Sequence, residues 1–267
     1  MSEKRWLGTG AVLLLAFVVA CGGSSEDGGG TTAEPAPSTP SSPSTAAPEA
    51  TTGATGTASI SGSIRYDGEV PNLPPLRMEA DPGCAKMHSD AVMPEVLVLG
   101  ENNALGNVIV YVKSGHGGGA YPTPADAVVL DQQGCRYTPH VTTVQTGQTF
   151  NILNSDGLLH NVHGLPKLNT PFNRAMPAAV TTSEYVFDKE EIFKIKCDVH
   201  PWMGAWVGVF SHPFHGVTGT DGGFSLDGLP AGDYEIEAVH ERLGTLTAQV
   251  TVADGESATR DFVFVRE

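Results

Sequence analysis

Residues 191–210 read EIFKIKCDVHPWMGAWVGVF, two short apolar runs joined by a loop that carries sulfur and imidazole side chains. Residues 193–197 alternate strictly between apolar and polar positions, which is the period of a strand with one buried face. Residues 206–210 are a second strand candidate. This stretch therefore predicts a strand that ends at the loop and another that begins directly after it.

Short runs of the same kind recur along the chain and are separated by turn residues such as glycine and proline. No long amphipathic helix and no internal repeat stands out between them. Many short strands at short intervals are typical of β-sandwiches and barrels. The sequence therefore predicts an all-β protein, with strands near residues 59–66, 107–112, 141–153, 193–197, 206–210, 234–239, 245–252 and 261–265.

The composition excludes several classes of protein. The 267 residues carry a formal charge of −15, which is the wrong sign for a nucleic-acid binder. Charged residues make up 17%, against about 25% in typical soluble domains, and there are 32 glycines and 19 prolines. That composition does not suit a helical bundle or a coiled coil. Four cysteines are too few for a disulfide-dense miniprotein, so each needs its own explanation.

The N-terminus has the pattern of an export signal over residues 1–20. Lys4 and Arg5 precede an apolar run, residues 7–20, that is shorter than a typical membrane-spanning helix. The small residues that end this run before Cys21 resemble the lipobox of bacterial lipoproteins. The resemblance implies cleavage before Cys21 and lipidation of its thiol, hence an exported protein anchored to a membrane and facing the periplasm or the cell exterior. An ordinary signal peptide and an uncleaved anchor are the alternatives.

The next segment has an unusually simple composition. Residues 22–58 contain only Gly, Ser, Thr, Ala, Pro, Glu and Asp. A segment without aromatic or large aliphatic side chains cannot bury a core. We therefore expect residues 21–58, the lipidated cysteine included, to be a disordered tether between the membrane and a folded head.

The loop between the two strands quoted above places Cys197, His200 and Met203 at the spacing C-x2-H-x2-M. A thiolate, an imidazole and a thioether on one short loop suit a soft or borderline metal ion. Two histidines and one cysteine with a weak axial methionine are the ligands of blue copper sites. The missing histidine is available at residues 160–163, after a strand predicted to end at Asn154.

In this order the motifs resemble the cupredoxins, in particular amicyanin, pseudoazurin and plastocyanin. The shared pattern is a strand that ends in Asn, then His-Asn, then Cys-x2-His-x2-Met near the end of the domain. The resemblance covers residues 126–212 and implies a Greek-key β-sandwich that holds one type 1 copper ion and transfers single electrons. Asn161 takes the place of the asparagine that ties the two ligand loops together. The implied ligands are His160, Cys197, His200 and Met203.

Other interpretations of these residues stay open. His163 competes with His160 as the first imidazole ligand, and zinc competes with copper, although zinc gains little from a methionine. A Cys-x2-His or a His-x2-His pair alone is more often structural than functional. The sequence offers no second nearby cysteine for a binuclear centre and no His-x-His pair of the kind found in multicopper enzymes. We therefore expect one mononuclear site and no enzymatic activity.

Cys84 and Cys135 are the pair left over once Cys21 is assigned to lipid and Cys197 to metal. Exported proteins live in an oxidising compartment, so a structural disulfide between the two is the expected arrangement. The alternative is a second metal site that draws on Cys84, His88, Cys135 or His140.

Trp202 lies beside the implied ligand His200 and has two candidate roles. It either packs in the core or belongs to an apolar patch where electron-transfer partners dock. The expected partner is a redox protein, such as a cytochrome or a copper- or quinone-linked enzyme. Contact with the membrane is expected only through the N-terminal lipid.

Residues 220–234, with D-G-G-F-S-L followed by L-P-A-G-D-Y, resemble the carboxypeptidase regulatory-like, transthyretin-like β-sandwich. Too few residues follow this motif to complete such a sandwich, and strands like its first two lie far upstream. The resemblance implies a non-catalytic sandwich made of residues 59–125 plus 213–267, with the cupredoxin-like domain of residues 126–212 inserted in it. Two sequential domains, with residues 59–125 as extra strands, are the simpler alternative.

Two further functions compete with electron transfer. A copper-binding storage, delivery or sensing protein would use the same ligands but exchange the ion readily. A structural or adhesive surface protein would not depend on the metal, so replacement of Cys197 would have no consequence for it.

Overall fold

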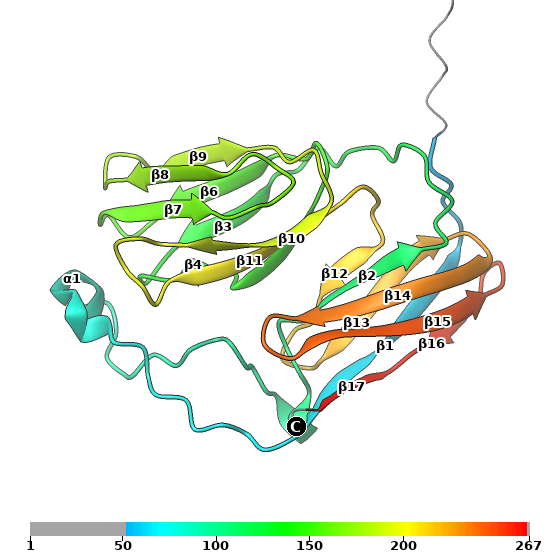
Figure 1. Cartoon of the computed structure of the whole chain (residues 1–267), viewed down its shortest axis with the longest axis horizontal. Coiled ribbons are helices and arrows are strands. Elements are labelled where there is room, and N and C mark those ends of the chain that lie inside the picture. Colours follow the sequence, from blue (N-terminus) through cyan, green and yellow to red (C-terminus); the bar gives the residue numbers. More distant parts are fainter. Residues whose placement is uncertain (1–51, 266–267) are drawn as a thin grey trace, which may run out of the picture. The chain divides into compact units, whose positions relative to one another are not determined.

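Strands make up nearly all of the regular structure in residues 52–265, the part of the chain that the computed structural model describes (Figure 1). The helical elements there are short: η1 (Met78–Ala80), α1 (Pro82–Ala85) and η2 (Glu101–Asn103). The all-β prediction is therefore confirmed. The predicted export signal, Cys21 and most of the predicted tether lie outside the described residues.

Two four-stranded sheets share one core and form the first sandwich (Figure 1). One sheet contains β1 (Ala58–Asp67), β13 (Gly223–Leu229), β16 (Ser257–Thr259) and β17 (Phe262–Val265). β1 lies at its centre, antiparallel to β13 and parallel to the other two strands. The other sheet has the order β12 (His215–Val217), β2 (Ile109–Ser114), β14 (Gly232–His240) and β15 (Gly244–Val252). Ile60, Val110 and Ile236 are fully buried where the two sheets meet.

The second sandwich pairs a four-stranded sheet with a five-stranded one. The four-stranded sheet has the order β4 (Tyr137–Thr138), β3 (Val128–Gln132), β6 (Phe150–Asn154) and β9 (Thr182–Tyr185). The five-stranded sheet has the order β5 (Val141–Gln145), β11 (Gly204–Phe210), β10 (Glu191–Lys196), β7 (His160–Gly164) and β8 (Phe172–Met176). Their inward-facing side chains form a second core, which includes Leu130, Phe150 and Ile195.

β10 and β11 show how the alternating sequence sets up this sheet. Phe193 and Ile195 are buried in the core, whereas Lys194 between them is exposed. The burial of each such side chain stabilises the sandwich by roughly 1.5–3 kcal/mol. The two strands pair antiparallel up to Lys196 opposite Gly204, so the seven residues between them form a loop at the end of the sheet. The hydrophobic alternation therefore fixes where this loop begins and ends.

In the sequence, the strands of the second sandwich lie between two strands of the first. β3 to β11 follow β2 in the sequence and precede β12. Ile109, Val141 and Phe210, from both sandwiches, form a small buried cluster. Glu241, after β14, accepts hydrogen bonds from His140 Nε2 at 2.5 Å and from Trp206 Nε1 at 2.9 Å. Apolar and polar contacts thus join the two sandwiches.

The connection between β1 and β2 passes over the second sandwich. Met78 and Cys84 of this connection are buried in the second core. On the way back, Leu105 N–H donates a hydrogen bond to the Ile64 carbonyl of β1 at 2.9 Å. Part of the span 59–125, predicted to belong to the first sandwich, therefore packs on the second, because its apolar side chains are buried there.

The region 141–153, predicted to contain a turn at Gly147, is two strands, β5 and β6, divided at residues 146–149. Each other strand region predicted from the sequence is a strand in the structure, with bounds that differ by no more than two residues. Strands with little apolar alternation were not predicted, such as β7, whose sequence is HNVHG, and the edge strands β8 and β9. Ordered structure also begins before residue 59, because β1 starts at Ala58 and Gly56 N–H donates a hydrogen bond to the Gly228 carbonyl at 2.8 Å. The end of the predicted tether is therefore part of the fold.

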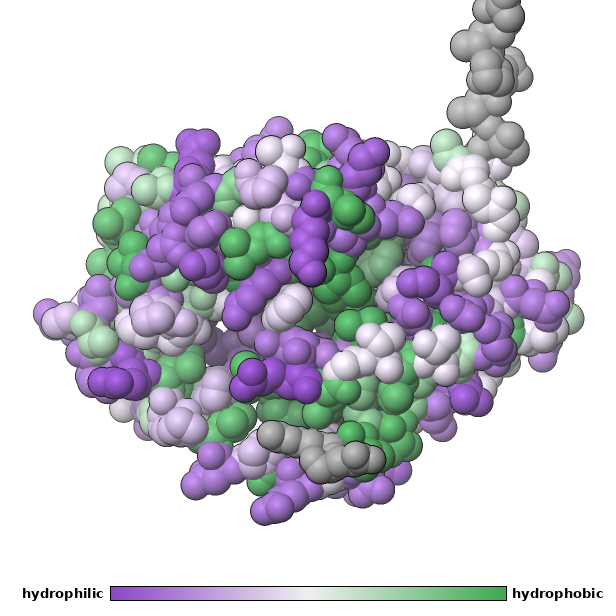
Figure 2. Space-filling view, viewed as in Figure 1, coloured by the Kyte–Doolittle hydropathy of each residue, from purple (hydrophilic) through white to green (hydrophobic). Residues whose placement is uncertain are grey.

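The surface mixes polar and apolar side chains. Figure 2 shows hydrophilic and hydrophobic residues interleaved over the face in view. The large apolar side chains that are exposed, such as Val70, Leu168 and Val265, come from different segments of the chain. Within residues 52–265, no helix has the length and hydrophobicity needed to cross a membrane.

Two buried histidines predict that the fold loses stability in acid. His212 and His240 are each 2% exposed, and their Nδ1 atoms accept hydrogen bonds from the backbone N–H groups of Phe214 and Arg242 at 3.2 Å. Burial lowers the pKa of both imidazoles to about 4. In the unfolded chain these histidines become protonated below about pH 6.5, whereas in the folded state they become protonated only near pH 4. Between these pH values the unfolded state binds more protons, so the free energy of unfolding falls as the pH falls. The slope is up to about 1.4 kcal/mol per pH unit for each histidine.

This expectation is tested by urea unfolding of the wild type and of His212→Asn between pH 7 and pH 4. Asparagine supplies an oxygen acceptor near the position of Nδ1 but does not titrate. We expect the pH slope of the variant to be smaller by about one proton. Identical slopes would show that His212 does not stay neutral in the folded state.

Candidate metal centre

The loop between β10 and β11 folds back on itself through its own backbone. Cys197 N–H donates to the Met203 carbonyl at 3.2 Å, and Met203 N–H donates to the His200 carbonyl at 2.9 Å. His200 N–H donates to Cys197 Sγ at 3.4 Å. These bonds close a compact turn that buries Cys197, His200 and Met203, each 3% exposed or less.

The other histidine comes from the start of β7, which is paired with β10. β6 ends at Asn154, whose Nδ2 donates to the carbonyls of Leu158 and Met176 at 2.9 Å each. These two bonds anchor the loop of residues 155–159. His160 is fully buried as the first residue of β7. The predicted order, a strand that ends in Asn followed by a candidate ligand histidine, therefore has a structural basis. The asparagine fixes the loop that positions the imidazole of His160.

Three donor atoms converge between these loops. The Nδ1 atoms of His160 and His200 lie 3.0 Å apart, and Cys197 Sγ lies 3.9 Å from His200 Nδ1. Together the three residues form a group whose ligand atoms all lie within 4.8 Å of one another.

These spacings fit a single metal ion. Bonds of about 2.0 Å to nitrogen and about 2.3 Å to sulfur, at tetrahedral angles, place two nitrogens about 3.3 Å apart and a nitrogen about 3.6 Å from a sulfur. The donors of His160, Cys197 and His200 therefore need little movement to share one ion. Met203, the predicted fourth ligand, lies on the same loop and lines the same cavity as Cys197.

Asp156 holds the first imidazole from its outer side. His160 Nε2–H donates to Asp156 Oδ2 at 2.8 Å. The carboxylate is itself fixed by the N–H groups of Gly134 and Cys135, at 2.6 and 2.7 Å. Both residues have positive φ angles, 63° and 51°, a conformation in which successive N–H groups converge on one anion. A carboxylate on the outer nitrogen fixes the tautomer and aims Nδ1 at the donor cluster.

Electrostatics favours an imidazolium–thiolate pair at this site. Burial lowers the pKa of His160, but the hydrogen bonds with Asp156 and Cys197 outweigh it and raise the pKa to about 9. Burial raises the pKa of the Cys197 thiol, but hydrogen bonds from His160 and from backbone N–H groups outweigh burial and lower it. The thiolate, which is the metal-binding form of cysteine, is therefore stabilised.

Asn161 connects the two ligand loops. Its Oδ1 accepts a hydrogen bond from Asp198 N–H at 3.1 Å, and its Nδ2 donates to Asn173 Oδ1 at 2.5 Å. Asn161 is the second residue of β7 and pairs with Ala175 of β8, whereas Asp198 directly follows the cysteine. The side chain thus links β7, next to His160, to the loop that carries Cys197.

Cys84 and Cys135 are joined in a disulfide. Both are fully buried, and the bond ties α1 to the turn that holds Asp156. Cys84 Sγ lies 3.6 Å from His200 Nε2. The disulfide therefore sits against the donor cluster rather than apart from it.

The remaining predicted site residues lie around the cluster. Trp202 is half-buried, its Nε1–H donates to the Cys135 carbonyl at 3.1 Å, and its ring centroid lies 5.1 Å from that of His200. His163 points to a different neighbour, since its Nδ1–H donates to Asp198 Oδ2 at 2.9 Å. The structure therefore places His160, and not His163, beside Cys197 and His200.

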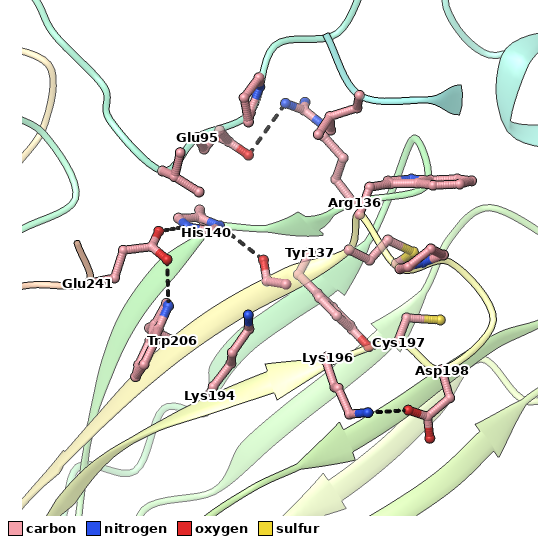
Figure 3. Close-up of a pocket in the computed structure, with 17 residues that line it drawn as sticks. Glu95, Arg136, Tyr137, His140, Lys194, Lys196, Cys197, Asp198, Trp206 and Glu241 are labelled. Atoms are coloured by element: carbon pink, nitrogen blue, oxygen red, sulfur yellow. Dashed lines mark hydrogen bonds and ion pairs between the residues drawn. The ribbon is translucent and has the colours of Figure 1, made fainter. Parts of the chain in front are cut away.

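A cavity of about 420 Å³ opens beside the cysteine (Figure 3). Arg136 and Glu95 form an ion pair in its lining, 3.4 Å apart, and Lys196 Nζ lies 2.7 Å from Asp198 Oδ1. His140, Glu241 and Trp206 form its other side, between the two sandwiches (Figure 3). The donor loop is therefore approached from solvent through a hollow with both polar and apolar lining residues.

Sequence comparisons identify no relative of the chain: no family model matches it, and no curated protein matches it. Solved structures with a similar backbone are cupredoxins and a copper enzyme. A copper(I) structure of an amicyanin mutant is 23% identical with a TM-score of 0.29, and the match covers 32% of this chain and 85% of amicyanin. A purple cupredoxin from Nitrosopumilus maritimus is 23% identical, with a TM-score of 0.27 and coverage of 32% and 99%.

The copper-containing nitrite reductase of Thermus scotoductus SA-01 is 16% identical, with a TM-score of 0.31. That match covers 55% of this chain but only 28% of the reductase, so the chain spans about a quarter of its length. Each likeness is partial and below 25% identity. What the site does therefore has to be inferred from the chain's own residues.

Two residues of the site were missed at the sequence level, Asp81 and Asp156, whose carboxylates contact the outer nitrogens of His200 and His160. Asp156 had a local signal, because it lies four residues before His160 on the same loop. Asp81 had none, because it comes from a distant connection between strands of the other sandwich.

Replacing Asn161 by alanine should weaken metal binding while the fold persists. The loss of the link to Asp198 leaves the two ligand loops free to separate, and changes of this type typically lower metal affinity about 10–100-fold. Competition with a chelator of known affinity measures the effect. Gln249→Ala, on β15 of the first sandwich, is the control, and equal affinities of the two variants would contradict the linking role.

Removal of the disulfide should destabilise the folded chain. The disulfide closes a loop between cysteines that are 51 residues apart, and the Cys84→Ala/Cys135→Ala double variant opens this loop. In the chain-entropy model, opening it lowers the free energy of unfolding by about 4 kcal/mol. Urea unfolding of the oxidised wild type and the double variant measures the difference. A loss below about 1 kcal/mol would show that the bond adds little constraint.

Proposed function

We propose that this protein binds one mononuclear copper ion of type 1 and carries single electrons. The observation that supports it most directly is the convergence of His160 Nδ1, Cys197 Sγ and His200 Nδ1 in one buried cluster, with Met203 on the same loop. This donor set is the one that suits copper in electron-transfer sites. Zinc would use the two imidazoles and the thiolate but has no preference for a thioether.

Bound copper would supply a one-electron redox couple. The residues of this chain would keep the positions of the copper ligands constant when the oxidation state of the ion changes. The hydrogen bonds of the 197–203 loop and the Asn161 bridge fix the positions of the donors. Asp156 holds the orientation of the His160 ring. A ligand set that does not move favours rapid electron exchange, because little rearrangement accompanies it.

Burial also bears on the storage and delivery alternative. The donor residues are at most 3% exposed, and both imidazoles are held by carboxylates on their outer nitrogens. A site for handing over copper needs donors that an incoming ligand can reach. The two imidazoles are buried and do not line the cavity beside Cys197 and Met203, which favours a resident ion over an exchangeable one.

The same proposal includes an exported, lipid-anchored protein. The basis is the sequence of residues 1–20 and Cys21, with a tether that leads to the ordered head. The partner in this scheme is a redox protein of the same compartment, and Trp202 next to His200 is the candidate contact with it.

Copper loading of the full chain tests the proposal. After addition of Cu(II) to the metal-free protein we expect an intense thiolate-to-copper absorption band in the visible region. Cys197→Ser and His160→Ala should abolish the band, because each removes a donor of the cluster. His163→Ala is the matched control and should retain it, since His163 faces Asp198.

Tight zinc binding without a visible band with copper would contradict the proposal. Stopped-flow mixing of the copper-loaded protein with reduced cytochromes distinguishes electron transfer from copper storage or delivery. A carrier changes oxidation state and retains its copper through repeated cycles, whereas a delivery protein loses copper to an acceptor. A Cys197→Ser strain with an unchanged, wild-type phenotype would instead favour the structural or adhesive function.

A further inference from the structure

Residues 76–92, here called the cover, lie against the metal loop although they connect two strands of the other sandwich. Leu76 N–H donates to the Val92 carbonyl at 2.8 Å, which closes the base of this segment. Met78 and Cys84 bury their side chains in the second core. The disulfide to Cys135 fixes the segment covalently. The cover is therefore held at its base, by its apolar contacts and by one covalent bond.

Asp81 of the cover contacts His200 directly. Its Oδ1 accepts hydrogen bonds from Gly83 N–H at 2.7 Å and from Cys84 N–H at 3.4 Å. Its Oδ2 accepts a hydrogen bond from His200 Nε2–H at 3.1 Å. Because the carboxylate is tied to its own backbone, the position of the cover determines the position of the imidazole.

The cover also explains why His200 is buried. Its chain neighbours Val199 and Pro201 are exposed, Val199 by 44%, yet His200 is only 2% exposed. The outer edge of its ring faces Asp81 and the sulfur of Cys84, which lies 3.6 Å from Nε2. A loop position that would otherwise reach solvent is thus closed by a segment from elsewhere in the chain.

We propose that the cover is a clamp on the copper site: Asp81 positions His200 for metal binding, and the disulfide-fixed segment shuts the ring edge off from solvent and partners. This inference rests on the proposed function for the identity of the metal. The clamp itself is a property of the chain, because its contacts join residues of the chain to one another. Asp81 is a positioning residue, since it acts on the metal only through His200.

The clamp has an electrostatic consequence. A carboxylate on the outer nitrogen makes an imidazole a stronger electron donor. The stronger donor stabilises the more highly charged oxidation state of a bound metal, so Asp81 lowers the reduction potential. Its side chain is 38% exposed, so solvent screens part of this effect.

Two measurements on the full chain test the clamp. The first is hydrogen exchange of the His200 ring N–H by NMR in the metal-free protein. Asp81→Ala removes a hydrogen bond to a charged group and opens the ring edge, so we expect exchange to be faster by about tenfold or more. Asp81→Glu retains a carboxylate and should recover part of the protection. Asp90→Asn is the control, because Asp90 lies in the cover and its carboxylate accepts a hydrogen bond from the neighbouring Ser89 instead of from His200.

The second measurement is the midpoint potential of the copper-loaded protein. Asp81→Asn removes the charge with little change in shape and should raise the potential relative to wild type and to Asp90→Asn. Equal exchange in Asp81→Ala and the control, or equal potentials in Asp81→Asn and the control, would overturn the clamp. If the chain takes up no copper, the proposed function fails, while the exchange measurement on metal-free protein still decides whether Asp81 holds His200.

Discussion

The pairing of β10 with both β7 and β11 is the constraint on which the rest of the site depends. Lys196, the last residue of β10, lies opposite Gly204 of β11 on one side and opposite His163 of β7 on the other. This register brings the start of β7 next to the loop that leaves β10. His160 therefore meets Cys197 and His200 although it lies about 40 residues before them in the sequence. A shift of β10 by one residue would turn its buried side chains outward and separate the donors.

Further side chains hold the donor residues in place, and they come from segments both near to and far from the donors in the sequence. Asn161 links the two loops, Asp156 orients His160 from the preceding loop, and Asp81 reaches His200 from a connection in the other sandwich. The disulfide belongs to the same set, because Cys84 carries Asp81 into place and Cys135 helps to hold Asp156. The two sandwiches are thus coupled at the donor cluster: a strand connection of one supplies part of the wall of a site built by the other.

Sequence reasoning predicted much of this arrangement where the signal was local. The alternation of Phe193 and Ile195 with polar neighbours predicted β10, and the spacing of Cys197, His200 and Met203 predicted one donor loop. β7 was missed because the polar residues His160 and Asn161 are buried in it beside Val162, so its sequence does not alternate. The clamp by Asp81 was missed for a different reason. Its contact depends on the path of a long connection, and no residue pattern near Asp81 encodes where that connection packs.

The central claim is that three donors hold a copper ion in an arrangement that does not change with oxidation state. They are the imidazole of His160 from β7, and the thiolate of Cys197 and the imidazole of His200 from the loop after β10. Copper X-ray absorption spectroscopy of the loaded full chain, in the oxidised and reduced forms, tests it most directly. The account predicts one sulfur and two nitrogen neighbours in both forms, at nearly the same distances. A spectrum without a short sulfur neighbour, or the loss of a nitrogen neighbour on reduction, would contradict it.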